Sequence, residues 1–234
     1  MNWKEANAYL NAYDKIQAQS QRYKYLLEQH LKALSLYTSI LDFGAGTGNL
    51  AVELLKKGKQ VTVIEPNKIA LDILKRKCLH FRANLVSYRG DDNRLEEFPP
   101  NSFDAITSSL VLPFPRDIPR HIANLKRVIK PGGILCISAW AYREDIEEGA
   151  INKLEAELKE KKLLEPENPN NVIREWDTIL QGAHSLTATI LERKLSRESL
   201  EQLLKTNEFS VAVEESAYKE YAYFLTAKSE KSKT

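Results

Sequence analysis

The sequence predicts an α/β fold in which a mostly parallel sheet carries helices on both faces. Short apolar runs of strand length, such as residues 38–41, alternate with segments whose leucines recur at helical spacing, such as Leu50 and Leu54. Acidic residues end three successive strand candidates, and a glycine-rich turn follows the first of them. Open α/β sheets bind ligands at this edge. With 234 residues, 43% of them hydrophobic, the chain suits one such domain with an elaboration.

The glycine-rich turn spans residues 42–48 and leads from the first strand candidate into a helix. Its glycines, at positions 44, 46 and 48, permit a tight turn and the close approach of a bulky ligand. A dinucleotide-binding turn would carry its third glycine where this chain has Asn49. The carboxylate of Asp42 would repel a pyrophosphate and would hold an ammonium group by a charge-assisted hydrogen bond. The turn therefore predicts a cofactor that carries a cation.

Together with this turn, most of residues 38–140 resemble the class I S-adenosylmethionine-dependent methyltransferases. Glu65 ends the second strand candidate, seventeen residues after Gly48. Gly90-Asp91-Asp92 follows the third, and Lys130-Pro131-Gly132-Gly133 ends a helix before strand five, predicted from residue 134 to 140. The resemblance implies S-adenosyl-L-methionine as cofactor and a Rossmann-like, seven-stranded sheet in the order 3-2-1-4-5-7-6 with an antiparallel last strand.

The resemblance also implies which residues hold the cofactor. Asp42 and the turn would surround its methionine part, and Glu65 would accept from both ribose hydroxyls. Asp91 would accept from the exocyclic amine of adenine, while Asp92 would contribute mainly its backbone. The expected cofactor-binding residues are Asp42, Gly44, Ala45, Gly46, Gly48, Glu65, Pro66, Asp91, Asp92 and Ser108.

No catalytic residue is assigned from the sequence. The sulfonium methyl group is electrophilic, so the protein can act mainly by positioning, and a general base is needed only for an acceptor that is protonated at working pH. Among the four histidines, His30 and His80 fall on helices expected to be remote from the strand ends, and His121 falls on the helix before strand five. We interpret these three as structural or exposed. His184 alone lies in the region expected near the substrate, and we interpret it too as a non-catalytic surface residue rather than a base.

The acceptor class follows from the segment after strand four, residues 108–115. It lacks the Asn/Asp-Pro-Pro-aromatic motif of amino-methylating DNA enzymes and resembles the loop of small-molecule methyltransferases, which often have histidine where this chain has Pro113. We predict methylation of an oxygen or nitrogen of a small molecule, with a protein side chain still open. Two other classes remain: a non-catalytic S-adenosylmethionine-binding module or partner subunit, and a nicotinamide-dependent oxidoreductase, which Asn49 and Asp42 disfavour.

Composition is compatible with this prediction. The chain has 34 Lys and Arg against 32 Asp and Glu, a balance that favours neither nucleic acid nor membrane as a partner. Cys78 and Cys136 have no zinc-ligand partners nearby in sequence and are expected to be reduced, so we expect neither a metal site nor a disulfide framework. Without a signal segment or a run of eighteen apolar residues, a cytoplasmic location is expected. Oligomeric state is not indicated.

Five regions are expected along the chain. The first region, residues 1–36, contains four tyrosines that we expect to be mostly packing anchors rather than cofactor contacts: Tyr9, Tyr13, Tyr23 and Tyr25. The fourth region, residues 196–228, is expected to begin with a helix capped by Ser196 and to end in strands 209–214 and 218–227. A β-leaning stretch, residues 186–191, precedes this region. The regions are a helical lid (1–36), the cofactor-binding core (37–142), a helical substrate-side insertion (143–195), a helix and β-hairpin that complete the sheet (196–228) and a mobile tail (229–234).

Overall fold

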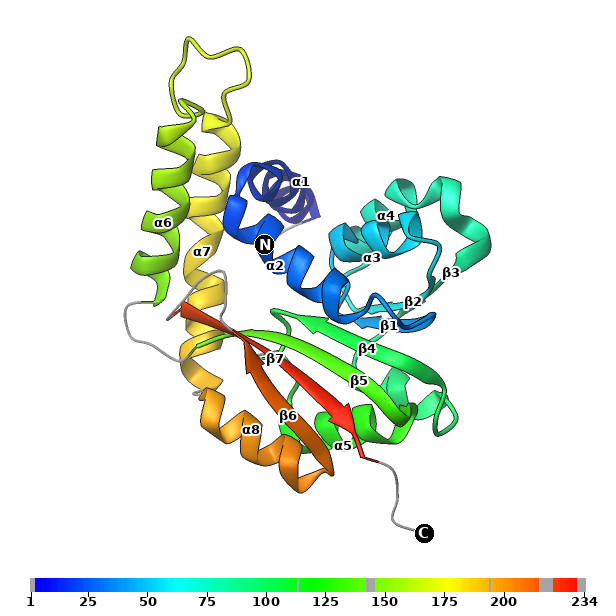
Figure 1. Cartoon of the computed structure of the whole chain (residues 1–234). Helices are drawn as coiled ribbons and strands as arrows, with labels where there is room; N and C mark the ends of the chain where they lie inside the picture. Colours follow the sequence, from blue (N-terminus) through cyan, green and yellow to red (C-terminus); the bar gives the residue numbers. More distant parts are fainter. Residues whose placement is uncertain (1–2, 113, 142–145, 194, 215–220, 231–234) are drawn as a thin grey trace.

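The computed structural model describes residues 3–112, 114–141, 146–193, 195–214 and 221–230. One sheet organises the chain (Figure 1), with seven strands in the order β3-β2-β1-β4-β5-β7-β6. The strands are β1 (Ser39–Phe43), β2 (Gln60–Glu65), β3 (Leu85–Arg89), β4 (Phe103–Ser109), β5 (Ile129–Trp140), β6 (Phe209–Glu214) and β7 (Ala222–Ser229). Strand β7 runs antiparallel to β5 and β6, while β1 to β5 pair in parallel. The predicted α/β fold and strand order are confirmed.

Helices cover both faces of the sheet. They are α1 (Trp3–Gln19), α2 (Gln21–Ala33), α3 (Asn49–Lys56), α4 (Lys68–Lys77), α5 (Ile118–Val128), α6 (Ile146–Glu160), α7 (Ile173–Arg193) and α8 (Arg197–Thr206), with short 3-10 helices η1 (Leu79–Asn84) and η2 (Asp92–Glu97). Helices α2, α3 and α4 bury their apolar stripes on one face of the sheet, and α5 and α8 bury theirs on the other. Ser196 caps α8 as expected, since its hydroxyl accepts from the N–H of Ser199.

A third apolar cluster lies away from the sheet. Helices α6 and α7 form an arm that projects from the sheet, and α1 lies beside this arm (Figure 1). Ile16 of α1 and Trp176 of α7 are among the buried members of the cluster. Ion pairs join the N-terminal helices to the arm, from Lys15 to Glu175 (2.5 Å) and from Arg22 to Glu157. The first helix is thus attached to the arm, outside the core of the sheet.

The prediction that residues 186–191 lean toward a β-strand is wrong, because these residues lie within helix α7. Its branched and aliphatic residues favour a strand locally, but they continue a helix whose earlier turns bury Trp176 and Ile179 against α1. The helical packing of the whole segment therefore outweighs the local preference.

The boundary before strand five also differs from the prediction. Helix α5 ends at Val128 and β5 starts directly at Ile129, so Gly132 and Gly133 lie inside the strand and do not end the helix. The register against β4 shifts there, and a side chain at Gly133 would meet the carbonyl oxygen of Asp104 at 2.6 Å. The glycines accommodate a bulge.

The C-terminal hairpin differs only at its ends. Strand β7 starts at Ala222, later than the predicted residue 218, and residues 218–220 are outside the described part of the chain. Ser229, expected in the tail, ends β7 and is buried, while residues 231–234 are not described. Across the described ranges, none of the helices is long and apolar enough to cross a membrane.

Candidate functional site

The glycine turn follows β1 directly. Gly44, Gly46 and Gly48 have φ angles of +73°, +54° and +84°, in the left-handed region that disfavours side chains. A β-carbon at Gly44 would collide with Val111, and one at Gly48 would lie 2.5 Å from Cγ of Leu74. A β-carbon at Gly46 would meet nothing within 4 Å. Two of the glycines are therefore required by the protein's own packing, whereas Gly46 borders open space.

Two buried carboxylates flank this turn. Asp42 on β1 and Glu65 at the end of β2 are 2% and 7% exposed. Burial, and then the charge of Glu65, raise the pKa of Asp42 to about 7. Among the residues that the structure describes, Oδ2 of Asp42 has no hydrogen-bond partner. A buried, unpaired carboxylate oxygen is costly, and a cationic donor beside it would relieve that cost.

Glu65 is turned toward backbone N–H groups. It accepts from the N–H of Gly46 and from that of Asn67, each at 2.8 Å. Burial raises the pKa of Glu65, and these two hydrogen bonds oppose the rise. Glu65 thus ties the tip of the glycine turn to the end of β2.

Asp14 on α1, which sequence reasoning did not single out, fastens the first helix to the turn. Its carboxylate accepts from the hydroxyl of Thr47 (2.5 Å) and from Nδ2 of Asn49 (3.2 Å), and it pairs with Lys77 of α4 (2.5 Å). Asn49 also donates to the hydroxyl of Tyr23 on α2. Nothing in the pattern of α1 distinguishes this one acid from its neighbours, so only the fold reveals its role.

We expect Asp14→Asn to lower the affinity for S-adenosylhomocysteine by about three- to tenfold, because losing a partly buried ion pair costs about 1 kcal/mol and frees α1 from the turn. The measurement is a calorimetric titration. Asp72→Asn is the matched control, since it removes the exposed pair with Lys68 on the same helix as Lys77 and should leave the affinity unchanged. Equal affinities for Asp14→Asn and the unchanged protein would contradict the role of Asp14.

A cavity of about 80 Å³ lies on the α1 and α2 side of the turn. Tyr13 and Tyr23 form part of its wall, with their rings in an edge-to-face contact. Burial raises the pKa of Tyr23 to about 12, so its phenol stays neutral. The lining residues are Tyr13, Tyr23, Leu27, Asp42, Gly44, Ala45, Gly46, Thr47, Asn49, Leu50, Ser109 and Leu110. Tyr9 packs instead against Gly182 of the arm, and Tyr25 is half exposed.

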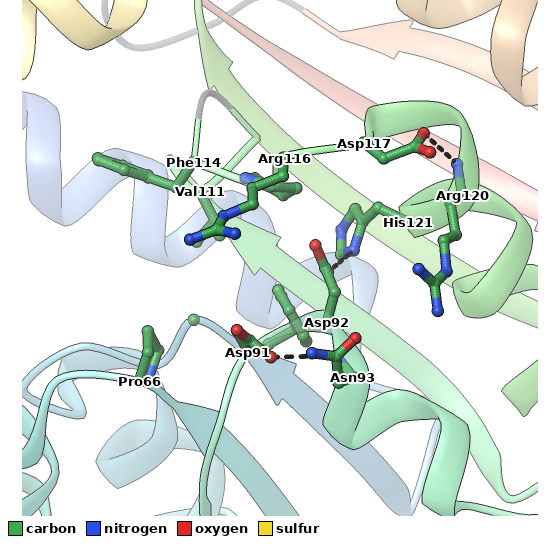
Figure 2. Close-up of a pocket in the computed structure, with 13 residues that line it drawn as sticks. Pro66, Asp91, Asp92, Asn93, Val111, Phe114, Arg116, Asp117, Arg120 and His121 are labelled. Carbon is green, nitrogen blue, oxygen red and sulfur yellow. Dashed lines mark hydrogen bonds and ion pairs between the residues drawn. The ribbon is translucent and has the colours of Figure 1, made fainter.

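A second cavity, of about 400 Å³, shares Gly44 with the first, and Figure 2 shows residues that line it. Pro66, Asp91 and Asp92 line it, as the resemblance implies for the adenine end. Asp91 caps η2 by accepting from the N–H of Asn93. The lining residues are Phe43, Gly44, Pro66, Asp91, Asp92, Asn93, Val111, Phe114, Pro115, Arg116, Asp117, Arg120 and His121. Gly44 belongs to both cavities, so a long ligand could extend across it.

His121, which we interpreted from the sequence as structural or exposed, lines this larger cavity. Its ring is buried against Phe43, its Nδ1 lies 2.6 Å from Oδ1 of Asp92, and its Nε2 has no hydrogen-bond partner. Because α5 begins soon after β4 ends, its first turns lie at the edge where the strands end. Figure 2 shows His121 and Asp92 directed toward each other at the cavity.

The other histidines are consistent with structural or surface roles. His30 is buried and hydrogen-bonded, and His80 is exposed. His184 lies on α7, but its side chain is outside the described part.

Some expected site residues line neither cavity. They are Gly48, Glu65 and Ser108. Ser108 is fully buried and its hydroxyl has no hydrogen-bond partner, whereas its neighbour Ser109 reaches the smaller cavity because successive side chains of a strand alternate. Within the described residues, no group of three or more His, Cys, Asp and Glu could hold a metal ion, and Cys78 and Cys136 are free and buried.

This sheet, with its glycine turn and acidic strand ends, defines a class of α/β proteins that bind a nucleoside cofactor at the switch point of the strand order. Residues 41–137 match the family model described as a methyltransferase domain. Residues 41–137 are thus similar to a methyltransferase domain, and the strand order is that of the class I methyltransferases, whose cofactor is S-adenosyl-L-methionine.

Similar proteins agree with this class. A demethylmenaquinone methyltransferase of Tropheryma whipplei (strain Twist) is 32% identical over 103 residues, which are 44% of this chain and 42% of the relative, so the chain spans less than half of that relative's length. An S-adenosylmethionine-dependent methyltransferase from Aquifex aeolicus has a TM-score of 0.60 at 18% identity, covering 93% of this chain and 97% of the other. The magnesium protoporphyrin IX methyltransferase from Synechocystis, solved with bound S-adenosylhomocysteine, has a TM-score of 0.58 at 14% identity, covering 92% and 86%.

The residues present fit this cofactor. The unpaired Oδ2 of Asp42 can accept from an ammonium group, and Gly46 leaves room at the cavity wall where a β-carbon would stand. Asp91 and Pro66 line the larger cavity, where a nucleobase could lie.

Proposed function

We propose that this protein transfers a methyl group from S-adenosylmethionine to an oxygen or nitrogen of a small-molecule acceptor. One observation carries the proposal: Asp42 is buried beside the glycine turn with a carboxylate oxygen that no group in the described part of the chain satisfies. A binding site for a pyrophosphate would not place a carboxylate there, which disfavours the nicotinamide alternative.

The chain's own residues would act mainly by holding and enclosing. The cofactor, when bound, supplies an electrophilic methyl group. Asp42 would hold the ammonium group of the methionine part, and Asp91 and Pro66 would contact the adenine end. Tyr13, Tyr23 and Leu27 form a wall contributed by α1 and α2, which would keep water away from the reacting atoms. Glu65 would exchange a backbone partner for the ribose hydroxyls.

Two observations favour a small acceptor. The acceptors named for the Tropheryma and Synechocystis proteins, demethylmenaquinone and magnesium protoporphyrin IX, are small molecules. The segment after β4 lacks the Asn/Asp-Pro-Pro-aromatic motif of DNA amino methylation, and the near-neutral charge favours no nucleic-acid partner. We place the reaction in the cytoplasm, because Cys78 and Cys136 are free thiols, as is usual in a reducing compartment.

Two further alternatives require a test. A module that binds the cofactor but methylates nothing would need Asp42 and Glu65 equally, and a protein side chain could replace the small acceptor. Purified protein is incubated with S-adenosylmethionine labelled in its methyl group and with fractions of a metabolite extract. We expect S-adenosylhomocysteine and a labelled small molecule to appear in equal amounts, and both to form more slowly with Asp42→Asn at a cofactor concentration that does not saturate the variant. If the protein binds S-adenosylhomocysteine but forms no labelled product in any fraction, the small-molecule transferase proposal is contradicted.

A further inference from the structure

A cluster of polar side chains lies buried between α2 and the sheet, beside the apolar residues that both contribute there. Thr107, Ser138 and His30 are each 0% exposed, and His30 packs edge-to-face on Phe224 of β7. Burying polar groups is costly unless each is paired, so a sheet face gains little stability from them where aliphatic residues would pack. None of the three lines either cavity.

Strand register brings this cluster to the cavity. Thr107 and Ser109 are two residues apart on β4, so their side chains share a face of the sheet. Ser138 of β5 is the register partner of Ser109. The hydroxyl oxygens of Ser109 and Ser138 are 3.1 Å apart, and Nε2 of His30 is 3.0 Å from Oγ of Ser138. Only Ser109 of this chain of groups lines the smaller cavity.

The other nitrogen of His30 orients the ring. Nδ1 lies 2.7 Å from Oγ1 of Thr107, a length typical of a hydroxyl donor, whereas 3.0 Å at Nε2 is typical of an N–H donor. Burial lowers the pKa of His30 to about 3, so the ring is neutral and carries one proton. On these distances that proton would lie on Nε2, with Nδ1 accepting from Thr107.

The remaining bonds can then run in one direction. Nε2–H of His30 would donate to Ser138, which leaves the hydroxyl proton of Ser138 available to the oxygen of Ser109. Ser109, having accepted this bond, has its own proton free to donate toward the smaller cavity, where Asp42 supplies an acceptor at a different point of the wall. The cavity would then offer one acceptor and one donor, which suits the ammonium and carboxylate groups of an amino acid.

We propose that His30 is a positioning residue which, through Ser138, fixes Ser109 as a hydrogen-bond donor for the carboxylate of the cofactor's methionine part. This rests on the proposed use of the smaller cavity for that part of the cofactor. His30 does not touch the ligand and exchanges no proton with it.

A double-mutant cycle on binding of S-adenosylhomocysteine tests the proposal. Ser109→Ala should weaken binding about tenfold, because a hydrogen bond to a charged group is lost. Ser138→Ala should weaken it about three- to tenfold although Ser138 lies outside the cavities, and the double variant should be no weaker than Ser109→Ala. Ser138→Thr keeps the hydroxyl and should restore most of the affinity. Ser229→Ala, which removes an equally buried serine at the far end of β7, is the control and should bind normally.

Nitrogen-15 spectra of labelled histidine give a readout independent of affinity. His30 should show its proton on Nε2, both free and with S-adenosylhomocysteine bound. A proton on Nδ1, an unchanged affinity for Ser138→Ala, or additive effects of the two serine substitutions would each overturn the proposal. If the unchanged protein fails to bind S-adenosylhomocysteine at all, the proposed function itself fails, which is a distinct outcome.

Discussion

Asp42→Asn is expected to weaken S-adenosylmethionine binding by about 10- to 100-fold while making the ligand-free protein more stable above neutral pH. The binding loss follows from removing a charge-assisted hydrogen bond, which contributes about 1.5–3 kcal/mol. The gain in stability follows because Asn keeps the shape of the side chain but never carries the buried charge. Calorimetric titration gives the first quantity and thermal unfolding gives the second.

The pH dependence has a definite sign. The pKa of Asp42 is about 7 in the folded protein and about 4 when unfolded, so the folded state binds the proton more tightly. The contribution of Asp42 to stability is therefore fully present below pH 4 and is lost as the pH rises through 7, at about 1.4 kcal/mol per pKa unit. Asp42→Asn and the unchanged protein should unfold at similar temperatures at pH 4, and the variant several degrees higher at pH 8.

Cofactor affinity should show the opposite trend, since the ammonium group needs the ionised carboxylate. In the unchanged protein it should fall as the pH drops below about 7, and in Asp42→Asn this dependence should disappear. Asp104→Asn, on the neighbouring strand β4, is the control. Lys130 holds the pKa of Asp104 below its usual range, so removing the Asp104 carboxylate should destabilise the fold and leave cofactor binding unchanged. Tight binding by Asp42→Asn would contradict the account.

Gly48→Ala is expected to destabilise the fold by about 2–5 kcal/mol. An alanine would adopt a left-handed conformation, at a cost of about 1–2 kcal/mol, and its β-carbon would overlap Leu74 of the core. Thermal unfolding should show a midpoint lower by roughly 5–15 °C.

Gly46→Ala, two residues away in the same turn, should separate folding from binding. It has a similar left-handed φ but open space at the β-carbon position, so the cost to the fold should be only about 1–2 kcal/mol. Since Gly46 lines the smaller cavity, the added methyl group should occupy ligand space and reduce cofactor affinity at least tenfold. Equal free energies of unfolding for Gly46→Ala and Gly48→Ala would show that the overlap with Leu74 does not determine the loss of stability.

The sheet could be predicted from the sequence because its signals are local. Strand-length apolar runs, the glycine turn and the acids that follow strands each stand within a few residues of one another. The stretch 186–191 was wrongly expected to be a strand because it continues helix α7, whose earlier turns pack on α1, more than 150 residues distant in sequence. Gly132 and Gly133 were misread because a bulge and a helix end use the same residue type.

The site was predictable only in part, for a similar reason. Asp42 and the turn carry their chemistry in their own spacing. Asp14 and His121 act through partners on other elements, at Thr47 and Asp92, and no pattern around either residue indicates those partners. His30 has the same property, since its environment is created by two strands more than seventy residues away.

Calorimetric titration of the folded protein with S-adenosylmethionine, and separately with nicotinamide dinucleotides, tests most directly whether the turn at residues 42–48 holds the sulfonium cofactor. We expect one S-adenosylmethionine to bind per chain, no binding of the dinucleotides, and weakened binding in both Asp42→Ala and Glu65→Ala. A folded sample that takes up a dinucleotide but not S-adenosylmethionine, or binding that is insensitive to both substitutions, would contradict the account.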